Sequence, residues 1–288
     1  ALRDDDGRAV GGIVRDEISG KEITVKSKVV IICAGPWTDE VRSAGQKEQK
    51  SMIRTTKGVH ILFAADRLPV NHAIVMSSVV DGRVVFAIPR GRVTLVGTTD
   101  TDYTGDPDDV HATSDDVEYL LKTVHHYFPD QGIVPQDIRA TYAGLRPLVR
   151  DDSDSPYDVS REHTVTVGDD ATVTIGGGKY TTYRLMADDV LSGAMKVMGL
   201  SRSERVKCAT RDAVLVGAEN LGPGQREELL ATFKEKAPDD IAEYLVNAYG
   251  SRSSNMIEGD MSRLVKGFPF VRAEIDYGVL QEAALTPA

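Results

Sequence analysis

The sequence predicts a mixed α/β (α+β) fold with an antiparallel sheet in its middle and a helical domain at its C-terminal end. Three features lead to this expectation. The run KVVIICAG at 28–35 is almost wholly apolar and ends at Gly-Pro, which is typical of a parallel strand buried on both faces. The middle third consists of short apolar runs separated by turn residues. Beyond Pro223 the sequence becomes polar with helical spacing.

The N-terminal segment begins with two short runs of alternating residues, 8–16 and 21–27, separated by a glycine-containing turn. This pattern predicts a β-hairpin. The buried strand at 28–35 follows, and Cys33 inside it is expected to be a reduced, buried thiol. Residues 37–46 are expected to form a short helix or a loop.

The middle third predicts an antiparallel sheet followed by a helix. Residues 115–128 place apolar side chains at a period of 3.6, which indicates an amphipathic helix. Asp115 and Asp116 lie in its first turn, and Ser114 is its expected N-cap. The four expected strands, divided by Asp-Gly and Arg-Gly turns, are 58–65, 72–79, 82–90 and 91–99.

The last part returns to strands and then becomes helical. Strands are expected at 137–149, 163–168 and 171–176, and a helix at 181–200. Two rather polar helical stretches, 226–250 and 270–285, suggest a small separate domain.

Composition excludes several classes of protein. With 288 residues, the chain can bury a substantial core as two domains or one large one. A net charge of -10 argues against a nucleic-acid partner, because phosphate backbones select basic faces. Two cysteines are too few for a disulfide framework, and no apolar run approaches the ~20 residues that span a bilayer. The chain opens without methionine in charged, turn-like sequence, so we expect a piece of a longer protein.

Two stretches invite comparison with known ligand loops. GGGKYTTYR at 176–184 lacks the spacing of a phosphate-binding P-loop, which leaves a tight turn with an exposed lysine or the lip of a cofactor pocket. No G-x-G-x-x-G fingerprint of dinucleotide binding occurs in the chain. VGTTDTDYTGDP at 96–107 is rich in carboxylates, but its spacing does not match a calcium loop, so we expect a strand end and turn and no metal.

Three side chains are candidates for chemistry, each with a plainer alternative. His60 lies on an expected strand and is either a structural histidine or a proton acceptor near neutral pH. Arg146, held extended by Pro147 among apolar neighbours, needs an anionic partner, which is either a ligand or a structural ion pair. Arg161 is either a surface arginine beside Glu162 or a guanidinium that binds phosphate.

Six motifs in series resemble the FAD-dependent glycerol-3-phosphate dehydrogenases and the related glycerol-3-phosphate oxidases. The likeness runs from about residue 7 to residue 283, and the family's N-terminal segment with its G-x-G-x-x-G is not in this chain. The motifs are ICAGPWTDEVR at 32–42, TKGVHILF at 56–63, VGTTDTDYTGDP at 96–107, AGLRPLV at 143–149, SREHTV at 160–165 and GGGKYTTYRLMADD at 176–189.

The resemblance implies a fragment of a flavoprotein with the FAD/NAD(P)-binding type of fold. Residues 1–42 would be part of the FAD-binding domain and 43–145 an antiparallel-sheet substrate domain. Residues 146–200 would return to the FAD-binding domain, and 201–288 would form a truncated C-terminal helical domain.

The resemblance also assigns roles to residues. His60 and Arg146 would be catalytic, with His60 as base or hydroxyl ligand and Arg146 on the reacting oxygen. Arg161 would bind the substrate's phosphate, and Lys179 would reach both substrate and flavin. The expected FAD-binding residues are Ala34, Gly35, Trp37, Gly177, Gly178, Lys179 and Thr181.

The implied activity is oxidation of sn-glycerol 3-phosphate to dihydroxyacetone phosphate, with hydride transfer to FAD and electrons passed to quinone. The alternatives are a catalytically incompetent fragment that holds no FAD, an oxidase that uses O₂, and another amine or hydroxy-acid oxidase of the same superfamily. The resemblance further implies peripheral attachment to the cytoplasmic face of a bacterial membrane, or to the mitochondrial inner membrane in a eukaryote, and homodimerisation.

Overall fold

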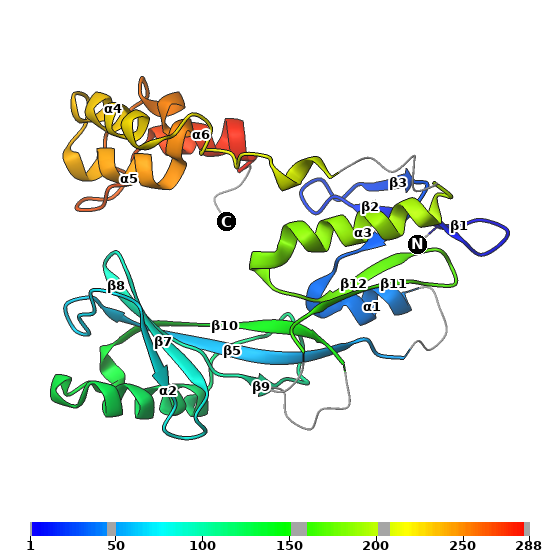
Figure 1. The fold of residues 1–288 in the computed structure, drawn as a ribbon, viewed down its shortest axis with the longest axis horizontal. Coiled ribbons are helices and arrows are strands. Elements are labelled where there is room, and N and C mark those ends of the chain that lie inside the picture. Colours follow the sequence, from blue (N-terminus) through cyan, green and yellow to red (C-terminus); the bar gives the residue numbers. More distant parts are fainter. Residues whose placement is uncertain (1, 45–49, 151–159, 201–207, 285–288) are drawn as a thin grey trace. The chain divides into compact units, whose positions relative to one another are not determined.

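A computed structural model describes residues 2–44, 50–150, 160–200 and 208–284 (Figure 1). The chain divides into two compact units, residues 1–207 and 208–288. The four-part domain division expected from the sequence stays a prediction.

The first sheet of the N-terminal unit contains the predicted hairpin. Strands β1 (Leu2–Arg3), β2 (Ala9–Arg15) and β3 (Glu22–Lys26) lie in that order and are all antiparallel. Gly11 has a φ of +148° and lies so close to β3 that a Cβ would be 2.0 Å from the Val25 carbonyl oxygen, so only glycine fits there. The sequence-based hairpin is confirmed.

The second sheet has six strands and forms the middle of the chain. Its order is β10-β5-β8-β7-β6, with β9 paired to β5, and every pair is antiparallel, as predicted. The strands are β5 (Ile53–Ala64), β6 (Ile74–Ser77), β7 (Val84–Arg90), β8 (Val93–Gly97), β9 (Thr101–Asp102) and β10 (Ile138–Val149).

Helix α2 (Ser114–Tyr127) packs on one face of this sheet. Its N-cap is Thr113 rather than the predicted Ser114. The Thr113 side chain and the Asp116 backbone and carboxylate form a capping box, which satisfies two N–H groups at once. The apolar core beneath α2 is closed to solvent and includes Val59, Ile61, Phe63, Met76, Val85, Val96, Leu120 and Val124.

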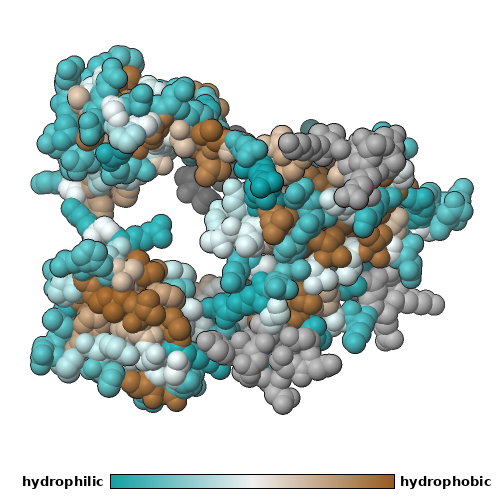
Figure 2. Space-filling model, in the orientation of Figure 1, coloured by the Kyte–Doolittle hydropathy of each residue, from teal (hydrophilic) through white to brown (hydrophobic). Residues whose placement is uncertain are grey.

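The opposite surface of the sheet is only partly covered. In Figure 2 apolar residues reach the visible surface of this part of the molecule. On β7, Val84 and Phe86 are about two-fifths exposed, at 42% and 40%. Apolar side chains are therefore available to a ligand on this face.

The third sheet contains strands from both ends of the unit. β12 (Val173–Gly177) pairs antiparallel with β11 (His163–Val167) and parallel with β4 (Ile31–Ile32). The parallel pairing was expected for 28–35, but burial on both faces is wrong, because β4 is a two-residue edge strand and Ile31 is exposed. Cys33, predicted to be buried, is exposed for the same reason.

Short helices flank the third sheet and tie it to the second. The 3₁₀ turn η1 (Gly35–Trp37) and helix α1 (Thr38–Ser43) follow β4. The Asp39 carboxylate of α1 accepts backbone N–H groups at the start of β5, from Met52 and Ile53. Those hydrogen bonds hold the Asp39 pKa below its usual value against partial burial, so the carboxylate stays charged and fixes the junction.

The remaining elements of the N-terminal unit are helical. Helix α3 (Tyr183–Val197) packs on β11 and β12, and it confirms the helix predicted at 181–200. The 3₁₀ turns are η2 (Pro129–Gln131), η3 (Pro135–Asp137) and η4 (Tyr180–Thr182).

The C-terminal unit is helical, as predicted. Its elements are η5 (Ala209–Arg211), α4 (Pro223–Lys234), α5 (Asp239–Tyr249), η6 (Gly250–Met256) and α6 (Ala273–Glu282). None of the described helices of the chain is long and apolar enough to cross a membrane. The unit has its own apolar core, which includes Phe233, Ile241, Leu245, Val246, Met256 and Val271.

Candidate active site

The face of the second sheet opposite α2 carries two of the predicted catalytic residues. Along β5, Val59 and Ile61 point into the core beneath α2, so His60 lies on the other face. In the antiparallel register, His60 is opposite Tyr142 and Arg146 is opposite Thr56. Because positions two apart on a strand share a face, His60 and Arg146 lie on the same side of the β5–β10 pair.

Two glycines make room for these side chains. A Cβ on Gly58 would lie 2.4 to 2.8 Å from the three end atoms of the Arg146 guanidinium. A Cβ on Gly97 would lie 2.1 Å from the His60 ring. Arg146 therefore folds back over Gly58 of the neighbouring strand, and the imidazole covers Gly97 at the end of β8.

Arg146 is fixed by the segment that follows β8. Its Nη1 donates to Asp100 Oδ1 at 3.1 Å, and its Nη2 donates to Thr98 Oγ1 at 3.2 Å and to the Thr99 carbonyl at 3.1 Å. Burial lowers the pKa of the guanidinium, and the Asp100 charge opposes that shift. The side chain thus stays charged and is held by three acceptors within one short segment.

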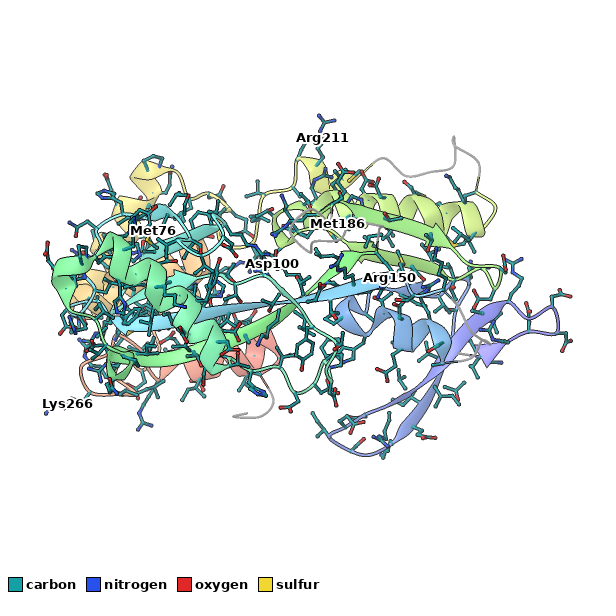
Figure 3. All side chains as sticks on the ribbon, turned by 90° about the horizontal axis from the view of Figure 1, so that it is seen from below. Met76, Asp100, Arg150, Met186, Arg211 and Lys266 are labelled. Atoms are coloured by element: carbon teal, nitrogen blue, oxygen red, sulfur yellow. The ribbon has the colours of Figure 1, made fainter. Side chains whose placement is uncertain are left out.

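Asp100 binds two further arginines. Arg161 Nη2 donates to Asp100 Oδ2 at 2.7 Å, and Arg83 donates to the Asp100 backbone carbonyl. The Asp100 side chain is only 6% exposed, whereas that of Arg161 is 37% exposed. Figure 3 labels Asp100 near the middle of the N-terminal unit, between Met76 of the large sheet and Met186 of α3.

A cavity of ≈ 500 Å³ opens over this arginine cluster. Cationic groups and threonine hydroxyls form much of its wall, and two apolar side chains of β7 form another part. Such a wall suits a small ligand that combines an anionic group with a hydrocarbon part. The lining residues are Arg83, Val84, Phe86, Thr98, Thr99, Asp100, Arg146 and Arg161.

His60 lies next to Arg146 but is not part of the cavity wall. Its ring stacks on Tyr142 with a centroid separation of 4.8 Å. Its Nδ1 is buried and has no hydrogen-bond partner among the described residues. Burial, and secondarily the charge of Arg146, lower the His60 pKa, so the imidazole is neutral near pH 7.

The glycine-rich turn lies at the carboxyl end of β12. Gly177 and Gly178 have φ values of +73° and +86°, and a Cβ on either would collide, with the Glu162 carbonyl and with Met186 respectively. The turn therefore needs glycine at both positions. The sequence left a tight turn with an exposed lysine and the lip of a cofactor pocket as alternatives, and the tight glycine turn seen here is compatible with both.

Beyond this turn the backbone enters η4 and α3. The side chains of Lys179 and Thr181 are exposed. The N-cap residue of α3, Thr182, makes no side-chain cap, so the first N–H groups of α3 receive no capping oxygen from that residue. The turn η4 continues directly into α3, and the Tyr183 N–H donates to the Tyr180 carbonyl, so the helical segment begins next to Lys179. An exposed cation at the start of a helical segment favours an electron-rich ligand edge.

The ICAGPW segment ends at the same edge of the third sheet. The parallel register pairs Thr174 with Ile32, so the residues after both strands emerge side by side. Gly35 has a φ of +55°, and Trp37 is 38% exposed and donates from Nε1 to Asp108 at 3.2 Å. Ala34, Gly35 and Trp37 therefore lie at the sheet edge that carries the glycine turn.

One backbone connection joins the glycine turn to the arginine cluster. The Gly178 N–H donates to the Glu162 carbonyl at 3.3 Å, and Glu162 directly follows Arg161. Arg161 in turn binds Asp100. The glycine turn is therefore hydrogen-bonded to Glu162, the neighbour of Arg161, and Arg161 lines the cavity.

The structure gathers some predicted site residues and leaves others apart. Arg146 and Arg161 meet at one carboxylate, with His60 beside them, whereas Lys179 is not among the residues that line the cavity. The sequence reasoning missed Asp100 and Arg83. The signal for Asp100 was available in the carboxylate-rich stretch at 96–107, which was interpreted as a strand end alone.

Among the described residues, no group of three or more His, Cys, Asp or Glu side chains has the arrangement of a metal site.

Comparison with known proteins gives two family matches. The model described as "FAD dependent oxidoreductase" matches residues 1–184, and the model described as "C-terminal domain of alpha-glycerophosphate oxidase" matches residues 208–288. The boundary between the two matches lies near the boundary between the two compact units.

Curated relatives of this chain include proteins from two Staphylococcus species. "Aerobic glycerol-3-phosphate dehydrogenase" of Staphylococcus saprophyticus is 33% identical over 296 residues, which cover 98% of this chain and 53% of that protein. The protein of the same name from Staphylococcus aureus is 33% identical over 257 residues, covering 86% of this chain and 46% of its own length. The chain therefore spans about half the length of the curated relatives it matches.

A solved structure matches nearly the whole chain. The glycerol-3-phosphate dehydrogenase from Bacillus halodurans complexed with FAD is 27% identical, with a TM-score of 0.84, over 99% of this chain and 56% of that one.

Proposed function

Because the chain belongs to the family of FAD-dependent oxidoreductases, we propose that it forms the substrate site of an enzyme that oxidises sn-glycerol 3-phosphate to dihydroxyacetone phosphate. The observation that carries this proposal is the cavity in which two arginines meet at one buried carboxylate beside the glycine turn. Glycerol 3-phosphate combines a dianionic group with a short hydrocarbon chain, which matches that wall.

Arg161 binds the phosphate in this proposal. Its guanidinium has five N–H donors in a planar fork, and Asp100 accepts a hydrogen bond from one of its nitrogens, Nη2. It is also the more exposed of the two arginines, so an incoming anion reaches it first. Charge-assisted, bidentate hydrogen bonds make arginine well suited to a phosphate.

Arg146 holds the oxygen on C2 of the substrate. The fixed guanidinium stabilises the negative charge that develops as the hydroxyl loses its proton, and needs no reorganisation to do so. Three acceptors already hold Arg146, so its position is set before substrate binds.

The proton leaves the C2 hydroxyl towards His60 or water. A neutral imidazole can accept a proton, and the lowered pKa keeps His60 neutral. Its Nδ1 is buried and has no hydrogen-bond partner among the described residues, so this nitrogen can still donate or accept one hydrogen bond.

The residues at the shared sheet edge fit a bound flavin. Gly177 and Gly178 leave a wall without side chains, and the start of α3 together with Lys179 offers positive potential. FAD held at this edge would supply the hydride acceptor for the oxidation at C2 of the substrate. Ala34, Gly35, Trp37 and Thr181 would complete the contact at that edge.

We further propose quinone as the electron acceptor, peripheral attachment to a membrane and homodimerisation. These three proposals rest on the family resemblance of the sequence motifs and not on any contact within the chain. An oxidase that transfers electrons to O₂ is the second candidate, favoured by the match of residues 208–288 to the glycerophosphate oxidase domain.

A spectroscopic titration tests the proposed function. The purified chain is loaded with FAD, separated from free flavin, and mixed anaerobically with glycerol 3-phosphate. We expect the flavin absorbance to bleach, with quinone restoring it faster than O₂. A folded chain that retains no flavin would support the incompetent-fragment alternative, since the chain spans only part of its relatives. A flavin-loaded chain that glycerol 3-phosphate does not bleach would overturn the proposed substrate.

A further inference from the structure

The buried carboxylate at the centre of the arginine cluster has no role in the proposed function so far. Asp100 lies after β8 and before β9, and its side chain is 6% exposed. The three arginines that contact it come from separate parts of the chain: Arg83 before β7, Arg146 on β10 and Arg161 before β11. Arg83 contacts the backbone carbonyl of Asp100, so the carboxylate itself binds two arginines, Arg146 and Arg161.

We propose that Asp100 is a positioning residue that fixes the spacing between Arg146 and Arg161 and thereby selects a phosphate ester over a free anion. The inference rests on the proposed function and deepens it. Each arginine binds a different oxygen of the same carboxylate, Arg146 at Oδ1 and Arg161 at Oδ2. The carboxylate therefore holds one guanidinium where the reacting oxygen would lie and the other where the phosphate would lie.

The segment that carries Asp100 is itself fixed on both sides. The Val59 N–H of β5 donates to Thr99 Oγ1 at 3.0 Å, which ties the residue before Asp100 to the central strand. Arg146 donates to Thr98 and Thr99, and Arg83 donates to the Asp100 carbonyl. With its backbone held in this way, the carboxylate cannot swing out of the cavity wall without breaking several hydrogen bonds.

A different role for Asp100 makes the opposite prediction. An internal anion that merely occupies the arginines would compete with substrate, so its removal would strengthen binding of every anion. A positioning residue does the reverse for the ester. Its loss adds one positive charge to the site and so favours inorganic phosphate, but it releases the guanidinium that must meet the C2 oxygen.

The test compares two ligands with the same anionic group. The dissociation constants of glycerol 3-phosphate and inorganic phosphate are measured by calorimetry, with the melting temperature, for the wild-type chain, Asp100→Asn, Asp100→Glu and Asp102→Asn. Asp102 is the matched control, because it forms a two-contact ion pair with Arg54 at 2.7 Å on the same sheet and outside the cavity wall.

We expect Asp100→Asn to weaken glycerol 3-phosphate binding by about 10- to 100-fold, since losing one hydrogen bond from the displaced, charged Arg146 costs about this factor. Inorganic phosphate should bind equally well or better. Asp100→Glu keeps the charge but moves the carboxylate by one methylene, so the melting temperature should recover while the preference for the ester stays reduced. Asp102→Asn should keep the wild-type preference.

Two outcomes would overturn the inference. If Asp100→Asn bound both ligands more tightly, Asp100 would be a competing anion. If Asp100→Glu restored both stability and ester preference, the residue would serve only to neutralise charge. A wild-type chain that binds neither ligand, or that shows no preference for glycerol 3-phosphate, would overturn the proposed function itself before any variant is compared. The binding measurement needs no flavin, so loss of cofactor does not imitate either result.

Discussion

Replacing Gly58 by alanine should weaken substrate binding while leaving the fold intact. The added Cβ would lie 2.4 Å from Arg146 Nη2, 2.7 Å from Cζ and 2.8 Å from Nη1. Ordinary van der Waals contact begins at 3.4 Å, so the guanidinium must retreat by about 1 Å. Its three hydrogen bonds are already 3.1 to 3.2 Å long, so such a shift should lengthen or break at least one of them.

The energetic consequences separate function from stability. Losing the charge-assisted hydrogen bond from Arg146 to the substrate oxygen should weaken binding by about 10- to 100-fold. Alanine in a strand is favoured over glycine by roughly 0.5–1 kcal/mol, which offsets part of the lost hydrogen bonding. Gly58 is not among the glycines with positive φ, so its backbone accepts alanine without strain. The variant should therefore melt within a few degrees of the wild type, as expected for a net change near 1 kcal/mol.

The matched control lies directly across the sheet. Gly144 of β10 pairs with Gly58, but a Cβ added to Gly144 meets nothing within 4 Å. Calorimetric titration with glycerol 3-phosphate and a thermal melt should show weak binding for Gly58→Ala and wild-type binding for Gly144→Ala. Wild-type affinity in Gly58→Ala would refute the idea that the guanidinium must be held over this glycine.

Three further predictions follow from buried or strained groups. Asp116→Ala removes a helix cap and leaves the almost buried Lys57, whose Nζ lies 2.6 Å from the carboxylate, without its partner, so the free energy of unfolding should fall by about 3–5 kcal/mol in chemical denaturation. The control, exposed Asp115→Ala, should change it by no more than about 0.5 kcal/mol, and equal effects of the two variants would contradict this. Because burial lowers the pKa of His60 in the folded protein, the unfolded chain binds a proton at this histidine first as the pH falls. The stability linked to His60 should therefore be complete above about pH 6.5 and decline below it, and His60→Gln should lose that part of the pH dependence of the melting temperature. In Gly178→Ala, the backbone keeps a φ of +86° and the new Cβ lies 2.5 Å from the Met186 sulfur, so we expect the melting temperature and the retention of flavin to fall together. Unchanged flavin retention would count against a flavin edge at this turn.

Local patterns predicted the elements well because each depends on its own residues. The four runs between 58 and 99 became β5 to β8, since alternating side chains and Asp-Gly or Arg-Gly turns specify strands without long-range information. The apolar run at 28–35 misled, because a pattern can indicate that a strand is apolar but not which neighbours cover it. Within the described parts of the chain, this strand pairs with β12 along one edge alone, so Ile31 and Cys33 are exposed.

The site was harder to predict because it depends on register. Arg146 and Arg161 were identified singly, but their common partner is set by how β10, β8 and the segment before β11 lie in space. A carboxylate between two strands has the same sequence signature whether it caps a turn or binds arginines. Gly58 likewise gave no signal, since its importance comes from a side chain on the neighbouring strand.

Anaerobic bleaching of the flavin by glycerol 3-phosphate in arginine variants tests the central claim most directly. FAD-loaded wild-type protein is compared with Arg146→Ala, Arg161→Ala and Arg54→Ala, the last being an arginine of the same sheet outside the cavity wall. The proposed site predicts that Arg54→Ala bleaches like the wild type. Arg161→Ala should need far more substrate, and Arg146→Ala should bleach slowly even at saturation. Bleaching at the wild-type rate and substrate concentration in both Arg146→Ala and Arg161→Ala would contradict the account.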